Sequence, residues 1–161
     1  MIRAFSDGDA AAIVGFWNPI VRDTGVTFTS ALKTPAEMVA YVAARRAAGR
    51  EVFVAEVAGQ VAGFAGYDQF RPSDGYLHSM EHTVILGPAA RGQGLGRALM
   101  RAVEDHARAA GAHVMIAAIS GENPAAVAFH AAIGYAEAGR LPQVGRKLGR
   151  WMDLVLMQKL L

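Results

Sequence analysis

At 161 residues with 53% hydrophobic content, the chain is long enough to bury a substantial core in one domain spanning residues 1–161, and too apolar to be disordered. The absence of cysteine excludes disulfides, thiolate catalysis and cysteine-ligated metals. The formal net charge of +2 is spread without basic runs, and no run of about 18 apolar residues occurs. We therefore expect a cytoplasmic protein with neither nucleic-acid nor membrane partners.

The first half of the chain predicts short strands and two helices. Capping patterns at Ser6–Asp9 and Thr34–Glu37 predict where the helices begin, and Pro19 predicts where the first one ends. Residues 21–33 and 71–78 lack a clear period and are expected to be loops. The expected elements are strands at 2–5, 51–57 and 61–70 and helices at 10–18 and 34–49.

Residues 80–97 change period twice, which predicts a strand, a glycine-rich turn and a helix. The β-branched residues Thr83, Val84 and Ile85 lie in an apolar run that ends at Gly87-Pro88, a pair that cannot continue a strand. After the turn, apolar residues recur at helical spacing from Leu95 onward. The stretch therefore brings a strand end, a tight turn and a helix start together.

The turn itself, Arg91-Gly92-Gln93-Gly94-Leu95-Gly96, has the composition of a phosphate cradle. Three glycines in five residues let backbone N–H groups converge, and the following helix adds its positive N-terminal end. No Lys-Ser or Lys-Thr follows, which argues against a nucleotide triphosphatase loop, and a dinucleotide-binding pattern would need its third glycine at residue 97. A plain strand-to-helix turn remains the alternative.

The second half predicts a further strand–helix unit and two closing strands. Asn123-Pro124 is a helix start and Gly134 a helix stop. Strands are expected at 113–119, 135–139 and 151–159, with an excursion at 140–150 between the last two. The whole order, β-α-α-β-β-β-α-β-α-β-β, predicts a mixed α/β sheet of about seven strands flanked by helices.

With this order and the turn pattern Arg/Gln-x-x-Gly-x-Gly, the sequence resembles the GNAT superfamily of acyl-CoA-dependent N-acyltransferases along its whole length. In that superfamily the turn holds the pyrophosphate of coenzyme A, so the resemblance implies acetyl-CoA as co-substrate and no metal. The cofactor-binding residues that it implies are Val84, Ile85, Leu86, Arg91, Gly92, Gln93, Gly94, Leu95, Gly96, Arg97 and Asn123.

Three longer motifs look like the phosphinothricin and methionine sulfoximine (or methionine sulfone) acetyltransferases. They are Arg71-Pro72 ahead of Met-Glu-His-Thr-Val, the segment at 113–119, and the segment at 141–154. The resemblance implies a small amino-acid-like amine substrate and a homodimer formed through the last segments. The substrate-binding residues that it implies are Phe28, Arg71, Ser73, Glu81, His82 and Thr83.

One competing pattern, His78-Ser-Met-Glu-His82, matches an inverted zincin motif, which needs both histidines on one helical turn. On a strand, at roughly 3.3 Å per residue, the two histidines lie about 13 Å apart, too far to share a zinc ion. The strand prediction for this segment therefore argues against zinc.

Glu81 is the candidate general base. Strand alternation places Glu81 and Thr83 on one face and His82 on the other. An α-amine with a pKa near ~7.7–8.0 is largely protonated at neutral pH, and a carboxylate can remove that proton, directly or through water, as nitrogen attacks a thioester. The resemblance implies this role for Glu81, whereas residue chemistry alone favours a paired or edge-exposed acid.

The resemblance also points to a general acid. Many family members carry tyrosine seven residues after the helix-starting asparagine, where it protonates the departing thiolate; here that position is His130, which otherwise is a packing histidine. Arg71 is a candidate clamp for a carboxylate or phosphinate, or else a solvated arginine. Two other functions stay open: acetylation of protein or peptide N-termini or polyamines, and a catalytically silent acyl-CoA-binding module.

Overall fold

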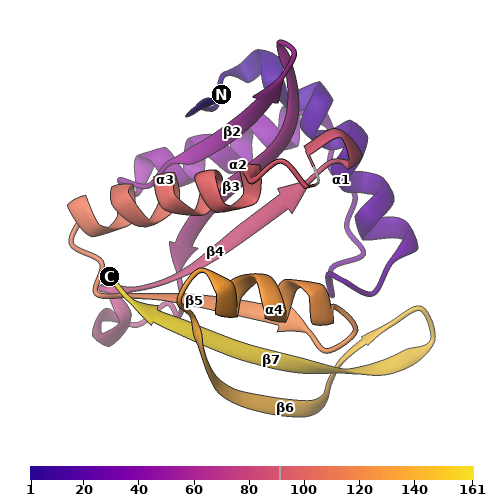
Figure 1. Ribbon diagram of the computed structural model, residues 1–161, viewed down its shortest axis with the longest axis vertical. Helices are drawn as coiled ribbons and strands as arrows, with labels where there is room; N and C mark the ends of the chain where they lie inside the picture. The colour runs from indigo at the N-terminus through magenta and orange to yellow at the C-terminus, as the bar shows by residue number, and fades with distance from the viewer. Residues whose placement is uncertain (91) are drawn as a thin grey trace.

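The computed structural model describes residues 1–90 and 92–161, and within them the chain forms one seven-stranded sheet with helices on both faces (Figure 1). This confirms the predicted order of elements and the mixed α/β class. The strands are β1 (Ile2–Ala4), β2 (Val52–Val57), β3 (Gln60–Gln69), β4 (Ser79–Leu86), β5 (Val114–Ser120), β6 (Ala136–Lys147) and β7 (Arg150–Leu160). The α-helices are α1 (Ala10–Asp23), α2 (Pro35–Ala47), α3 (Leu95–Ala109) and α4 (Pro124–Ala132), and short 3-10 turns occupy Asp7–Asp9, Asp74–Tyr76 and Pro88–Ala90.

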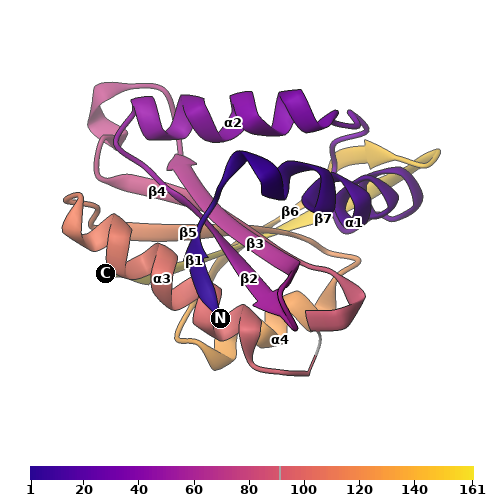
Figure 2. The ribbon, with the colours of Figure 1, turned by 90° about the horizontal axis from the view of Figure 1, so that it is seen from above.

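The helices divide the molecule into two layers of core, one on each side of the sheet. Figure 2 shows α1 and α2 on one face and α3 and α4 on the other. Ile13, Trp17 and Met38 bury against Phe64 on the first face, and Leu99 and Val103 bury against Met115 and Met157 on the second. None of the described helices is long and apolar enough to cross a membrane.

Helix α1 continues five residues beyond the predicted end at residue 18, so the prediction that Pro19 ends it was wrong. Proline removes one hydrogen bond to the carbonyl four residues earlier, at a cost of about 3 kcal/mol. Ile13, Trp17 and Val21 recur every four residues and are all buried. Burying one such side chain contributes roughly 1.5–3 kcal/mol, so the added burial of Val21 offsets much of that cost and the helix runs on to Asp23.

The predicted excursion at 140–150 was also wrong, because β6 runs on to Lys147 and pairs with β7 along its length. The register shifts between Glu137 and Gly139 and again between Leu141 and Gly145. Such irregularities break the two-residue alternation by which a strand is recognised. The sequence pattern and the pairing of β6 are both interrupted at these two points, and the pairing with β7 resumes after each of them.

The sheet opens in its middle, between the parallel strands β4 and β5. The two strands pair only at Ser79–Glu81 with Val114–Ile116. Beyond that point β4 stays paired with β3 as far as Leu86, and β5 stays paired with β7 as far as Ser120. Because each strand follows its outer neighbour, the carboxyl ends of β4 and β5 separate and leave a wedge-shaped opening.

Candidate active site

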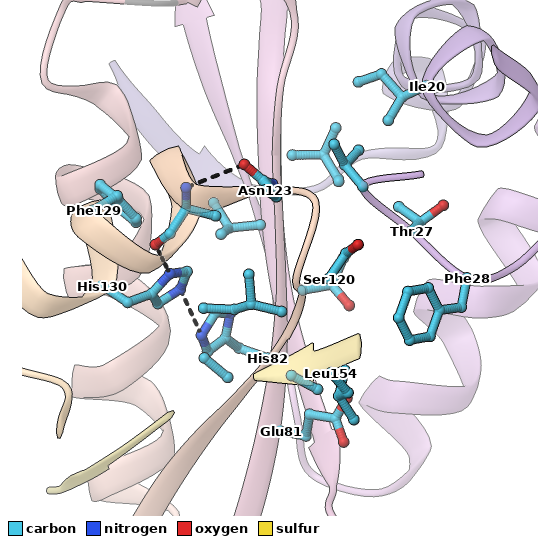
Figure 3. A pocket seen from close by; sticks show the side chains of 18 of the residues that line it. Ile20, Thr27, Phe28, Glu81, His82, Ser120, Asn123, Phe129, His130 and Leu154 are labelled. Atoms are coloured by element: carbon cyan, nitrogen blue, oxygen red, sulfur yellow. Dashed lines mark hydrogen bonds between the residues drawn. The ribbon is translucent and has the colours of Figure 1, made fainter. Parts of the chain in front are cut away.

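A cleft of about 1090 Å³ fills the opening between β4 and β5 (Figure 3). Its first side is the strand wall, which we define as residues 81–86 of β4 and 117–120 of β5. Its second side is the loop wall, formed by the segment 24–29 (all but Gly25 line the cleft), Phe70, Arg71, Leu141 and Leu154. Helix α4 closes the cleft, from its N-cap Asn123 to Phe129 and His130.

The structure brings many of the predicted site residues together in this cleft, although they come from five separate segments. Those that line it are Phe28, Arg71, Glu81, His82, Thr83, Val84, Ile85, Leu86, Gly96, Asn123 and His130. Six others lie outside the lining: Ser73, Gly92, Gln93, Gly94, Leu95 and Arg97. Arg91 lies outside the described residues.

The glycine turn leads into the N-terminus of α3 as predicted. Gly94 caps the helix with φ +71°, a left-handed conformation that favours glycine. A Cβ on Gly96 would lie 3.3 Å from Leu86 Cδ1 and 3.4 Å from the Phe129 ring, so glycine lets α3 begin close to both β4 and α4. The backbone N–H groups of the first helical turn have no intrahelical acceptor, which makes this end suited to an anion.

Glu81 lies where β4 and β5 part, with its side chain half-buried in the cleft (Figure 3). Burial raises the pKa of this carboxyl above its ordinary value, the negative charge of Asp68 raises it further, and the positive charge of Arg71 opposes both. Asp68 is the residue directly opposite Glu81 on β3. Glu81 therefore has the environment of a proton acceptor, a carboxyl whose pKa is shifted toward neutrality.

His82 points to the other side of β4 and stacks on His130 of α4, with ring centroids 4.9 Å apart. The two Nε2 atoms are 3.1 Å apart, and His130 Nδ1 is 2.7 Å from the carbonyl oxygen of Ala126. Since a carbonyl only accepts, His130 Nδ1 carries a hydrogen and donates it; His130 Nε2 then accepts from the N–H of His82. Figure 3 shows these bonds continuing the helix cap, in which Asn123 Oδ1 accepts from the N–H of Ala126.

Both histidines are buried, with exposed fractions of 8% for His82 and 3% for His130. Burial lowers the pKa of both imidazoles, and that of His82 falls to about 3. Both rings are therefore neutral at pH 7. In this arrangement both ring nitrogens of His130 form hydrogen bonds. His82 was predicted to bind substrate; its side chain contacts α4 and lies on the opposite side of β4 from Glu81.

The two histidines of the zincin pattern have different partners, since His78 Nδ1 lies 2.8 Å from the Gly111 carbonyl while His82 pairs with His130. Among residues 1–90 and 92–161 no group of three or more His, Asp or Glu side chains is placed to hold a metal ion.

Much of the cleft lining was not predicted from the sequence. Residues 117–120 of β5 and Leu154 and Leu156 of β7 line it, as do Trp17 and Ile20 of α1. Their apolar patterns indicated burial, and no signal in them distinguishes a side chain that lines a cleft from one in the core. Helix α1 was predicted to end before Pro19 but ends at Asp23. Residues 24–29 follow this end directly, so the place of the loop wall could not be predicted without the longer helix.

Comparison with known proteins places this geometry among acetyltransferases. The family model "Acetyltransferase (GNAT) family" matches residues 8–135. The L-methionine sulfoximine/L-methionine sulfone acetyltransferase of Salmonella typhimurium is 38% identical over 157 residues, covering 98% of this chain and 92% of that protein.

Two solved structures match across nearly the whole chain. The ribosomal-protein-alanine N-acetyltransferase of Brucella melitensis superposes with a TM-score of 0.95 at 39% identity, covering 100% of this chain and 99% of that one. The phosphinothricin acetyltransferase of Sinorhizobium meliloti, in complex with acetyl-CoA, gives 0.94 at 31% identity, with 100% and 88% covered. This chain therefore belongs to the GNAT family of acetyltransferases.

Proposed function

We propose that the protein transfers the acetyl group of acetyl-CoA to the amine of a small amino-acid-like substrate. The observation that carries the proposal is the parting of β4 and β5 at Glu81, which puts a carboxylate at the closed end of a cleft. The other end of β4 leads to the glycine turn and the α3 N-terminus. A proton acceptor and an anion-binding turn are thus joined by one strand.

Acetyl-CoA is the co-substrate that this layout supports. Its pyrophosphate suits the described part of the glycine turn and the start of α3, residues 92–97, where N–H groups and the helix end favour negative charge. Because β4 has left β5 while it stays paired with β3, those N–H and C=O groups of Val84–Leu86 that point away from β3 face the opening and can bond the amides of the pantetheine arm. Asn123, at the other edge, is a second polar contact for that arm. The Sinorhizobium relative was solved with acetyl-CoA bound.

Glu81 is proposed as the general base, acting directly or through water. It takes a proton from the substrate ammonium, and the amine nitrogen attacks the thioester carbonyl. A C–N bond forms, and the carbonyl oxygen becomes an oxyanion for which the backbone N–H groups near Val84 are the proposed donors. The C–S bond then breaks as the nitrogen loses its second proton, which passes to the departing CoA thiolate directly or through solvent, so that the products are the amide and the free thiol.

The contacts in the site do not single out a proton donor for that thiolate as they single out Glu81 as the base. A thiol pKa of roughly 8.5 makes thiolate a good leaving group without assistance. Protonation by His130 stays a prediction, and it requires a proton on Nε2 and hence the loss of the bond from His82. If His130 is the acid, His130→Gln should reduce kcat more below pH 7 than above it, because burial lowers the pKa of this imidazole and only the protonated ring can donate from Nε2.

An amino-acid-like substrate is supported by the charges and by the relatives. Arg71 lines the cleft and its charge reaches Glu81, which suits a substrate whose anionic group lies close to its amine. The Salmonella relative is named for methionine sulfoximine and methionine sulfone, and the Sinorhizobium structure for phosphinothricin. We propose that this enzyme's substrate belongs to the same class.

The second candidate is acetylation of a protein N-terminus, favoured by the name of the Brucella neighbour. Polyamines are disfavoured, because Glu81 is the single carboxylate among the described residues of the lining. A silent acyl-CoA-binding module is disfavoured by the position of that same carboxylate. A screen of acetyl-CoA turnover with amino-acid analogues, alanine-initiated peptides and polyamines, reading free thiol, separates these functions.

Glu81→Gln tests the base. The variant keeps shape and hydrogen bonding but accepts no proton, so kcat should fall by about 10²–10⁴ with an unchanged Kd for acetyl-CoA. Activity should recover partly toward pH 10, where solvent deprotonates the amine. Glu137→Gln, which removes an exposed carboxylate on β6, is the control. Near wild-type kcat for Glu81→Gln at neutral pH would show that Glu81 only positions substrate.

We also propose that two copies associate through the β6–β7 hairpin. Leu141, Val144, Leu148 and Trp151 are exposed apolar side chains in this hairpin, from 43% to 56% accessible, and Leu141 also lines the cleft. Sedimentation should find a dimer at micromolar concentration and a monomer for Trp151→Asp; a wild-type monomer would contradict the proposal.

A cytoplasmic location remains a prediction.

A further inference from the structure

The part of the loop wall that faces Glu81, residues 24–29, is held from a distant place in the chain. It follows the end of α1 and has no regular secondary structure. Figure 3 shows Phe28 pointing into the cleft from this segment. Three contacts tie the segment to the second half of the chain, and we call residues 145–150 of the β6–β7 hairpin, with Glu122, the clamp.

The first contact is between Phe28 and Gly145. A Cβ built on Gly145 would lie 2.6, 2.7 and 2.9 Å from three carbons of the Phe28 ring. The φ of Gly145 is outside the left-handed region, so its backbone conformation does not call for glycine. Space for the Phe28 ring is the reason that glycine fits here.

The second contact is the buried ammonium of Lys147, whose residue is 5% exposed. Its Nζ donates to the Thr27 carbonyl at 2.7 Å and to Thr27 Oγ1 at 3.3 Å. Among the described residues no carboxylate forms a salt bridge with it, and burial lowers the pKa of this lysine. Burying a cation that bonds only neutral oxygens costs folding free energy. The two hydrogen bonds to Thr27 offset part of that cost and fix the position of Thr27.

The third contact lies at the start of the segment. Glu122 and Arg150 form a two-pronged ion pair with both N–O distances at 2.7 Å. A Cβ on Gly25 would lie 2.3 Å from Glu122 Oε2 and 2.9 Å from Met152 Cε. The chain at Gly25 therefore passes tightly against this pair, and residues 25, 27 and 28 are each fixed by a different part of the clamp.

We propose that Gly145 and Lys147 are specificity-determining residues, which set the length of the amine substrate's side chain by fixing the Phe28 ring. The proposal rests on the proposed transfer of acetyl to a small amine. Phe28 has the backbone of Gly145 behind it and the cleft in front of it, so any bulk added at residue 145 drives the ring into the cleft. Neither residue lines the cleft, and both act through the segment that does.

The methyl group of Gly145→Ala should push the Phe28 ring into the cleft and so shorten the room left for the substrate side chain. A displacement of about 1 Å in a substrate-positioning group can cost about 100-fold in rate, and one methylene in an apolar pocket discriminates about 10–200-fold. We therefore expect kcat/KM for methionine sulfone to fall about 10–100-fold, while kcat/KM for alanine changes by less than about threefold. The Kd for acetyl-CoA should not change, because the strand wall is untouched.

Lys147→Met removes the ammonium but keeps the length of the side chain. It should release residues 24–29, seen as faster amide hydrogen exchange in that segment, and should flatten the preference among substrates of different length. It also keeps the test independent of whether Gly145→Ala folds. Gly139→Ala, on the same strand with nothing within 4 Å of the added methyl, is the matched control and should behave as wild type.

The experiment measures kcat/KM of the four proteins for glycine, alanine, 2-aminobutyrate and methionine sulfone, with Kd for acetyl-CoA and hydrogen exchange. An equal fold-change for all four amines, a parallel loss of acetyl-CoA affinity, or unchanged exchange at 24–29 in Lys147→Met would overturn the proposal. A wild-type enzyme that acetylates none of these amines would instead refute the proposed function, and the exchange measurement would still decide whether the clamp holds the loop.

Discussion

The two walls of the cleft are built on different physical principles. The strand wall is backbone, and β3 and β7 hold it from outside by unbroken ladders of hydrogen bonds. The loop wall is mostly side chains on irregular segments, held by single contacts such as Lys147 with Thr27. A ladder changes little when one side chain is replaced, whereas a single contact is lost outright. Chemistry common to all substrates therefore suits the first wall, and choice among substrates the second.

The largest effect is expected at the end of the strand wall. Gly94→Glu should abolish measurable acetyl-CoA binding, a loss of at least about 100-fold in Kd, because a carboxylate at the helix start repels pyrophosphate. Titration calorimetry checks it. Gly49→Glu is matched, since Gly49 also has a left-handed φ, of +74°, and open space around it. Equal affinities for Gly94→Glu and Gly49→Glu would mean that the turn does not bind phosphate.

A smaller and different change is expected from the loop wall. Arg71→Ala should raise KM for anionic amino-acid analogues about 10–100-fold with kcat nearly unchanged, because a hydrogen bond to a charged group contributes about 1.5–3 kcal/mol to ground and transition states alike. Amino-acid amides, which lack the carboxylate, serve as control substrates and should show no rise. A fall in kcat instead would place Arg71 in the chemical step and break the division between the walls.

Behind the strand wall, the buried ring of His82 stacks on His130 of α4, and this burial should make the stability of the protein depend on pH. Folding lowers the pKa of His82 to about 3, so the unfolded chain, with a pKa near ~6.5, takes up the proton first and stability falls as pH drops below that value. His82→Gln keeps an N–H for His130 but does not titrate.

Chemical denaturation at pH 7 and pH 5 checks this. Between those values the variant should lose about 2 kcal/mol less of its unfolding free energy than wild type, at about 1.4 kcal/mol per pH unit below 6.5. Identical losses would mean that His82 is charged in the folded protein.

The smallest change is expected from Asp68→Asn. Asp68 raises the pKa of Glu81, and it also holds Arg50 and Arg45. Asp68→Asn removes this negative charge and frees the two arginines. Both changes favour the ionised form of Glu81, so the pKa of Glu81 falls. Since the base acts when ionised, the acidic limb of the kcat/KM profile should move to lower pH. A limb that moves to higher pH, or that disappears together with activity, would contradict the assignment of Glu81 as base.

The difference between the walls also explains what the sequence could predict. The strand, glycine turn and helix of residues 80–97 are contiguous, and each has a local signature, so β4, the turn and the position of Glu81 were predicted. The loop wall depends on contacts between residues more than 100 positions apart, such as Phe28 with Gly145, which no local pattern reports. The continuation of α1 through Pro19 was missed because burial of Val21 outweighed a local rule.

The joint between β4 and β5 also bears on how the chain folds. The buried residues of the α1–α2 core all lie between Phe5 and Phe64, and of β4 only Ile85 packs against them, so most of this core can form early during synthesis. The opposite core joins Ala55 to Met157 and must wait for the C-terminal strands. With three residue pairs linking β4 to β5, we expect assembly to end at this joint, so that the active site is the last part of the protein to form.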